Sequence, residues 1–202
     1  MGTYKVTNIK QGVKNPNRAN VFIDGKFAFS LDVIQIVDYK LKVGQELSET
    51  EYAELKNASE FGKLYQKTLE WTLSRPHSEK EVNDYLYKKI YEKKLDKKYI
   101  DLITEKLKSK NYIDDASFAE YYMENRFVKK GISKKRLRLE LVKKGVASEI
   151  IDGVLDKRND EEEIKKIIAK KRAKYDDEKL INYLCRQGFP FELAQSLVRE
   201  TD

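Results

Sequence analysis

The chain has 202 residues, of which 37% are charged and 40% hydrophobic, so its apolar surface suits several thin layers better than one thick core. Its net charge is +7, and its 13 Tyr, 8 Phe and 1 Trp supply enough large buriable side chains to exclude a disordered chain. No uninterrupted apolar run exceeds three residues, whereas a membrane-spanning helix needs roughly 20, so we expect neither a membrane protein nor a signal peptide.

Residues 1–59 are predicted to form a β-rich domain. Tyr4–Ile9 is rich in β-formers, and Asp24-Gly25 stands between two hydrophobic runs, which is typical of a two-residue hairpin turn. We expect a three-stranded antiparallel sheet. Two helices should follow at about 32–39 and 48–59, the second begun by a capping box from Ser48 to Glu51.

From about residue 60 onward the pattern is helical and repeats. At an offset of 43 residues Leu137 matches Leu180, Leu141 matches Leu184 and Gly145 matches Gly188. Each copy reads as a capped helix, a glycine stop and a short second helix, preceded by a longer helix at 115–129 or 161–174.

A less regular copy precedes these two. A capping box begins at Ser78, 55 residues before Ser133, Ile90 replaces the glycine, and flanking helices are expected at about 60–74 and 97–110. We therefore predict a mainly α chain with three tandem three-helix repeats, at 60–111, 112–158 and 159–202. Units this small should stack into an elongated, curved array.

The segment from Arg126 to Gly145 carries nine Lys or Arg against the single acid Glu140, a local charge of +8 that accounts for the net charge of the chain. On the helix after Ser133, Lys135, Arg136 and Lys143 should lie within about 100° of each other, on the side opposite Leu137 and Leu141. A solvated helix face is the plain interpretation, but such a concentrated positive field also suits a polyanion or an acidic protein surface.

The other candidate residues favour structural roles. Asp114 and Asp115 precede a helix and lack a third ligand, so a helix cap explains them better than metal binding or catalysis. With one cysteine, Cys185, and one histidine, His77, the sequence predicts no disulfide, metal site or cofactor. A single cysteine points to the reducing cytoplasm. No P-loop or dinucleotide glycine pattern is present either, so we expect a protein that is not an enzyme.

These residues also carry a family resemblance. Tyr112-Ile113-Asp114-Asp115-Ala116-Ser117-Phe118-Ala119, then Arg126, Gly131 and Glu140-Leu141 followed by Lys144-Gly145, resembles the central signature of the RecX family. Arg75-Pro76-His77-Ser78 is similar to an Arg-x-Arg-Ser pattern in the first repeat of that family, with His77 where an arginine is usual. The resemblance covers essentially the whole chain.

The resemblance implies a bacterial regulator that binds the RecA recombinase and its filament on single-stranded DNA. Such a protein inhibits RecA ATPase activity and strand exchange, and so restrains recombination, DNA repair and the SOS response. The motif assigns no contact residues. From charge alone we expect the contact at Arg126, Lys129, Lys130, Lys134, Lys135, Arg136, Arg138, Lys143 and Lys144.

A standalone nucleic-acid-binding helical-repeat protein is the alternative, because the same basic segment could bind DNA phosphates without RecA. Single-stranded DNA could therefore be contacted directly or through RecA. No sustained heptad predicts a coiled-coil dimer, so we expect a monomer.

Overall fold

The computed structural model describes residues 3–13 and 15–200, except for the side chains of residues 126–130. Contacts divide the chain into two compact units. One unit contains Met1–Trp71 and Lys88–Tyr99, and the other contains Thr72–Tyr87 and Ile100–Asp202. None of the helices in the described part of the chain is long and apolar enough to cross a membrane.

The first unit contains a four-stranded antiparallel sheet in the order β3-β2-β1-β4. Its strands are β1 (Tyr4–Gln11), β2 (Arg18–Ile23), β3 (Lys26–Asp32) and β4 (Glu46–Leu47). The predicted turn is confirmed, because Asp24 and Gly25 both have positive φ between Ile23 and Lys26, which pair with each other. The fourth strand was not predicted, since its two residues are too few to show an alternating pattern.

The helices of this unit differ from the prediction in one respect. Helix α1 (Val33–Asp38) is where it was expected, but the segments predicted at 48–59 and 60–74 form one helix, α2 (Glu49–Thr72). Its capping box is present, with Ser48 N donating to Glu51 and Glu51 N donating to Ser48 Oγ. The helix continues through Gly62, where a Cβ would lie 3.3 Å from the Arg18 guanidinium. Gly62 therefore leaves room for Arg18 rather than ending the helix.

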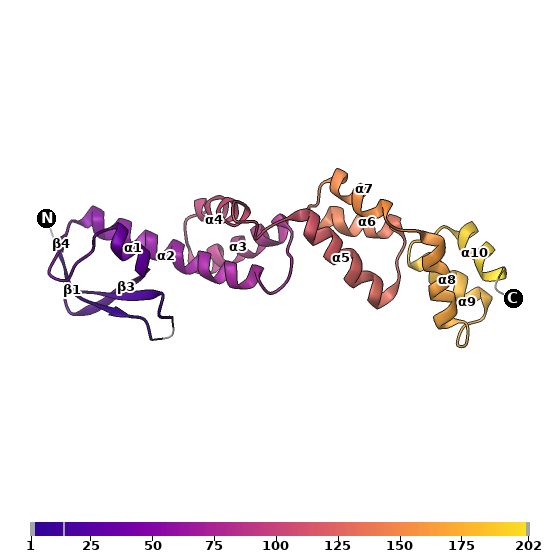
Figure 1. Ribbon diagram of the computed structural model, residues 1–202, viewed down its shortest axis with the longest axis horizontal. Helices are drawn as coiled ribbons and strands as arrows, with labels where there is room; N and C mark the ends of the chain where they lie inside the picture. The colour runs from indigo at the N-terminus through magenta and orange to yellow at the C-terminus, as the bar shows by residue number, and fades with distance from the viewer. Residues whose placement is uncertain (1–2, 14, 201–202) are drawn as a thin grey trace. The chain divides into compact units, whose positions relative to one another are not determined.

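The rest of the chain is helical (Figure 1). The helices are α3 (Glu79–Lys93), α4 (Lys98–Lys108), α5 (Asp115–Lys130), α6 (Lys134–Lys143), α7 (Ser148–Asp156), α8 (Asp160–Lys171), α9 (Asp177–Arg186) and α10 (Phe191–Arg199). The three predicted repeats correspond in chain order to α2–α4, α5–α7 and α8–α10.

The second and third repeats have the same plan, as the offset of 43 residues predicts. Helix α7 packs on α5 and α6, and α10 packs on α8 and α9. The matched leucines of α6 and α9, at 137, 141, 180 and 184, are all completely buried. Gly145 and Gly188 have φ of 81° and 92°, so both helix stops use the left-handed conformation that glycine adopts at little cost.

Candidate functional site

Helix α6 presents the predicted basic face at Lys135 and Lys143, whereas the third predicted member, Arg136, is half-buried. Ser133 begins the helix by accepting a hydrogen bond from Arg136 N at 3.2 Å. Leu137 and Leu141 are completely buried in the core of the second repeat, and Lys135 and Lys143 are exposed. The helical period therefore separates an apolar face from a charged one.

Three of the predicted contact residues are engaged within the protein. Arg136 Nη1 donates to the carbonyl of Arg186 in the third repeat at 2.6 Å, and Arg138 forms an ion pair with Asp152 on α7. Lys144 Nζ lies 2.6 Å from a Glu81 carboxylate oxygen in the first repeat. These cations stabilise the packing of helices and repeats, so their charge is partly neutralised before any partner arrives.

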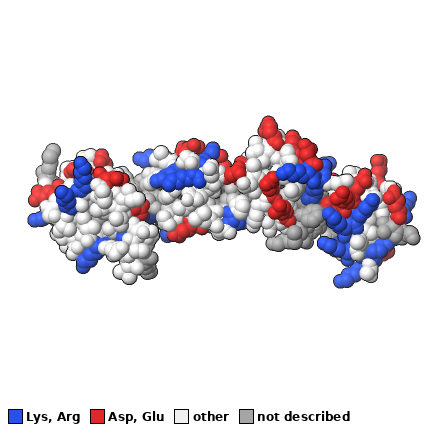
Figure 2. Space-filling model, in the orientation of Figure 1, with Lys and Arg blue, Asp and Glu red and all other residues white. Residues whose placement is uncertain are grey.

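The remaining predicted contact residues fall into two groups. Lys135 and Lys143 are exposed, Lys134 is half-buried, and none of the three side chains forms an ion pair with a carboxylate in the described part of the chain. The side chains of Arg126, Lys129 and Lys130, at the end of α5, lie outside the described residues. Figure 2 shows Lys and Arg side chains interspersed with Asp and Glu over the second and third repeats. The charge available to a partner is therefore smaller than the sequence count.

The Asp114-Asp115 pair is structural, as predicted, but its two members act differently. Asp114 is the cap of α5 and accepts hydrogen bonds from Ala116 N and Ser117 N. The Ser117 hydroxyl, with these amides, holds the pKa of Asp114 below its ordinary value. Asp115 instead accepts a hydrogen bond from Glu79 N at 2.8 Å, which joins the second repeat to the start of α3. Burial raises the pKa of the Asp115 carboxyl.

Glu81 is the centre of the same joint. Ser78 Oγ caps α3 by accepting from Glu81 N, and the hydroxyl also donates to the carbonyl of Lys144 at 2.8 Å. The Glu81 carboxylate forms ion pairs with Arg75 Nη1 at 2.9 Å and with Lys144 Nζ at 2.6 Å, rather than completing the capping box that the sequence predicts at Ser78. Burial opposes ionisation of Glu81, but hydrogen bonds from Lys144 and Arg75 outweigh it and lower the pKa.

The joint between the second and third repeats uses the same device. Asn159 caps α8 by accepting from Glu161 N, and Asp160 Oδ1 accepts from Lys134 N at 2.9 Å. Ser133 N donates to the carbonyl of Gln187 at 3.1 Å. Asp160 thus plays the role of Asp115. The matching pairs Asp114-Asp115 and Asn159-Asp160 were the sequence signal for this contact, but one pair alone looks like a simple cap.

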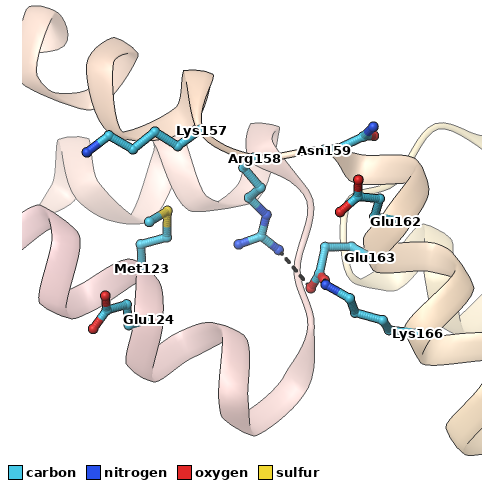
Figure 3. Close-up of a pocket in the computed structure, with 8 residues that line it drawn as sticks. All are labelled: Met123, Glu124, Lys157, Arg158, Asn159, Glu162, Glu163 and Lys166. Atoms are coloured by element: carbon cyan, nitrogen blue, oxygen red, sulfur yellow. Dashed lines mark hydrogen bonds and ion pairs between the residues drawn. The ribbon is translucent and has the colours of Figure 1, made fainter.

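A cleft of about 490 Å³ lies at this second joint (Figure 3). Arg158 enters it from the loop between α7 and α8, and Arg158 Nη2 lies 3.3 Å from Glu163 Oε2 on α8, with both side chains about 95% buried. The same nitrogen donates to the carbonyl of Ile132. Lys166 lies 3.4 Å from the other Glu163 oxygen. Arg158 and Glu163, the buried charges of the cleft, are thus paired with each other across the joint.

His77 and Cys185 show no catalytic arrangement. His77 is 3% exposed ahead of the Ser78 cap, and burial, with the nearby Arg75, holds its pKa below the ordinary value, so it is neutral at pH 7. Cys185 is a half-buried free thiol on α9. No cluster of three or more His, Cys, Asp or Glu suited to a metal ion occurs among the described residues.

Comparison with known proteins places the chain among regulatory proteins. A family model described as the Regulatory protein RecX N-terminal domain matches residues 4–48, and one described as RecX, second three-helix domain, matches residues 114–155. Regulatory protein RecX of Listeria monocytogenes serotype 4a is 34% identical over 97% of this chain and 75% of the relative. Regulatory protein RecX of Bacillus licheniformis is 30% identical over 98% and 77%.

Solved structures show the same fold. A crystal structure of regulatory protein RecX superposes with a TM-score of 0.72 at 24% identity, covering 96% of this chain and 98% of that one. Crystalline RecX from Lactobacillus salivarius gives a TM-score of 0.54 at 22% identity, covering 69% of this chain and 95% of its own.

Proposed function

The chain belongs to the RecX family of regulatory proteins, and from this premise we propose that it binds the RecA filament on single-stranded DNA and inhibits RecA. The inhibition would act on ATP hydrolysis and strand exchange, and so on recombination and the SOS response in the cytoplasm. The observation that carries the proposal is the match to curated RecX proteins over nearly the whole chain. The helical repeats are consistent with a binding protein and, among the described residues, supply no metal-binding cluster.

We place the contact at the exposed side of α6. Lys135 and Lys143 are the exposed, unneutralised members of the predicted basic set among the described residues, with the half-buried Lys134 beside them. Ionic contacts of exposed lysines chiefly speed association and fix the orientation of a partner. Arg136, Arg138 and Lys144 support this face through their internal contacts instead.

The test is single-stranded-DNA-dependent ATP hydrolysis by RecA from the same organism. We expect substoichiometric amounts of the protein to slow hydrolysis. Unchanged hydrolysis at an equimolar ratio would refute the proposed function.

A double variant, K135A/K143A, tests the location. We expect roughly a fivefold loss of inhibitory potency, steepest at low salt, and a folding stability within about 0.5 kcal/mol of the original. The matched control is K26A/K42A, which removes the same charge from two exposed lysines of the β-rich unit. Equal potency of both variants would show that only the net charge matters.

DNA binding without RecA is the second candidate, since the chain has a net charge of +7. It predicts an affinity that falls steeply with salt, by about one counterion for each phosphate contacted. The internal engagement of Arg136, Arg138 and Lys144 reduces the number of phosphates this face can neutralise. We therefore favour RecA, and salt-dependent retention on single-stranded DNA in the absence of RecA measures the alternative directly.

A further inference from the structure

The exposed face of α6 is not purely basic. Leu139 and Val142 are 55% and 53% exposed, although both belong to the helix that buries Leu137 and Leu141 completely. Leu139 lies one turn after Lys135 and one turn before Lys143, and Val142 lies three residues after Leu139. Two aliphatic side chains therefore form a contiguous patch with a lysine at each end.

The repeat architecture does not require this patch. The equivalent helix of the third repeat, α9, carries Asn182 at the position of Leu139 and Cys185 at that of Val142. Helix α3 of the first repeat carries Asp84 at the position of Leu139. Because the other two helices of this type have a polar side chain where α6 has Leu139, packing of the repeat does not explain the exposed leucine.

The chemistry of the face identifies its partner. Aliphatic side chains cannot donate hydrogen bonds to phosphate oxygens, so the two at the centre of this face contribute nothing to binding of a phosphate backbone. A protein partner can bury these two side chains, because protein–protein interfaces combine an apolar centre with a polar rim. The rim here is cationic. The sole acid of α6, Glu140, is already held by the hydroxyl of Tyr122 and by Arg136.

We propose that this face of α6 docks an acidic amphipathic protein segment, with its apolar side chains on Leu139 and Val142 and its carboxylates near Lys135 and Lys143. The inference rests on the proposed function, since the segment belongs to RecA within its filament. It assigns the protein contact to α6 and makes contact of this face with DNA phosphates secondary.

The experiment compares L139A/V142A with the original protein in two assays. Inhibition of RecA ATP hydrolysis should require about tenfold more of the variant, because the two truncations remove apolar area that the docked segment would bury. Retention of RecA-free single-stranded DNA should be unchanged. Alanine keeps the helix propensity of α6 high, and the matched control L102A/V43A removes the same atoms from two positions that are 53% and 60% exposed.

Each outcome decides the matter. Weaker inhibition by L139A/V142A alone, with unchanged DNA retention, supports docking of a protein segment on α6. Inhibition equal to that of L102A/V43A overturns this inference but leaves the proposed function standing. A loss of DNA retention in L139A/V142A also overturns it, since the face would then contact nucleic acid. If the original protein does not inhibit RecA at all, the proposed function and this inference fail together.

Discussion

The two joints between repeats share one hydrogen bond, from a backbone amide to an aspartate carboxylate, and differ in their ion pairs. At each joint an aspartate at the start of a helix accepts a hydrogen bond from an amide of the preceding repeat, Asp115 from Glu79 and Asp160 from Lys134. The first joint adds the partly exposed Arg75, Glu81 and Lys144 network. The second adds the buried pair of Arg158 and Glu163.

The difference shows which part of a joint the repeat requires. The aspartate contact ties the first helix of one repeat to the repeat before it. It occurs at both joints, with hydrogen bonds of 2.8 and 2.9 Å. The ion pairs are local additions, and their energetic weight depends on burial. A buried charge that loses its partner is costly, whereas a partly exposed one can be hydrated by water.

Removal of Arg158 should have the largest effect. In R158M the buried Glu163 carboxylate loses its main partner, so we expect the free energy of unfolding to fall by about 3 kcal/mol. Urea unfolding followed by far-ultraviolet circular dichroism measures the change. The double variant R158M/E163M, with no buried charge left, should recover most of the loss. A loss below about 1 kcal/mol in R158M would mean that the two joints do not differ in this way.

Substitution of Glu81 should cost less. Its side chain is 13% exposed, but Arg75 and Lys144 are 36% and 38% exposed and can be hydrated, so E81Q should destabilise the protein by about 1.5 kcal/mol at pH 7. The cost should also depend on pH. Because the pKa of Glu81 is lowered in the fold, its contribution is present above the unfolded pKa of about 4.3 and is lost as the pH falls through the folded pKa.

Stability measured from pH 7 downward checks this sign. The difference between the original protein and E81Q should shrink toward zero with increasing acidity. A difference that stays constant across this range would show that charge plays no part at the first joint.

The shared aspartate contact should give the smallest effect, equal at the two joints. D115A and D160A each leave one backbone amide without its acceptor, which we expect to cost about 1 kcal/mol. In D115N the side-chain amide oxygen can still accept the hydrogen bond from Glu79 N. The substitution removes the Asp115 carboxyl, whose pKa is raised by burial. The stability of the original protein falls as the pH rises through that raised pKa, so D115N should be at least as stable at pH 7. Thermal unfolding of the three variants tests both points, and a destabilised D115N would contradict them.

Much of the repeat plan was readable in the sequence because it depends on local rules. The caps at Ser133 and Asp114, the buried Leu137 and the stop at Gly145 each follow from neighbouring residues and the helical period. The hairpin turn at Asp24-Gly25 was predictable for the same reason.

Sequence spacing could not show which charges are already paired. Arg136, Arg138 and Lys144 belong to the same basic run as Lys135 and Lys143, yet they are engaged across helices and repeats. Their partners lie 14 to 63 residues away in the chain for Arg138 and Lys144, so no local pattern reveals them. The exposure of Leu139 beside the buried Leu137 likewise became visible only once the burial of each side chain was known.

The sequence by itself therefore determined most of the helices, several of their caps and stops, and the excess of positive charge in the second repeat, because hydrogen bonds and periodicity within a few residues govern these features. Only the tertiary structure decided that Asp115 and Asp160 join neighbouring repeats, and which described members of the basic run are paired within the protein. The physical reason is that burial and ion pairing depend on residues brought together from distant parts of the chain.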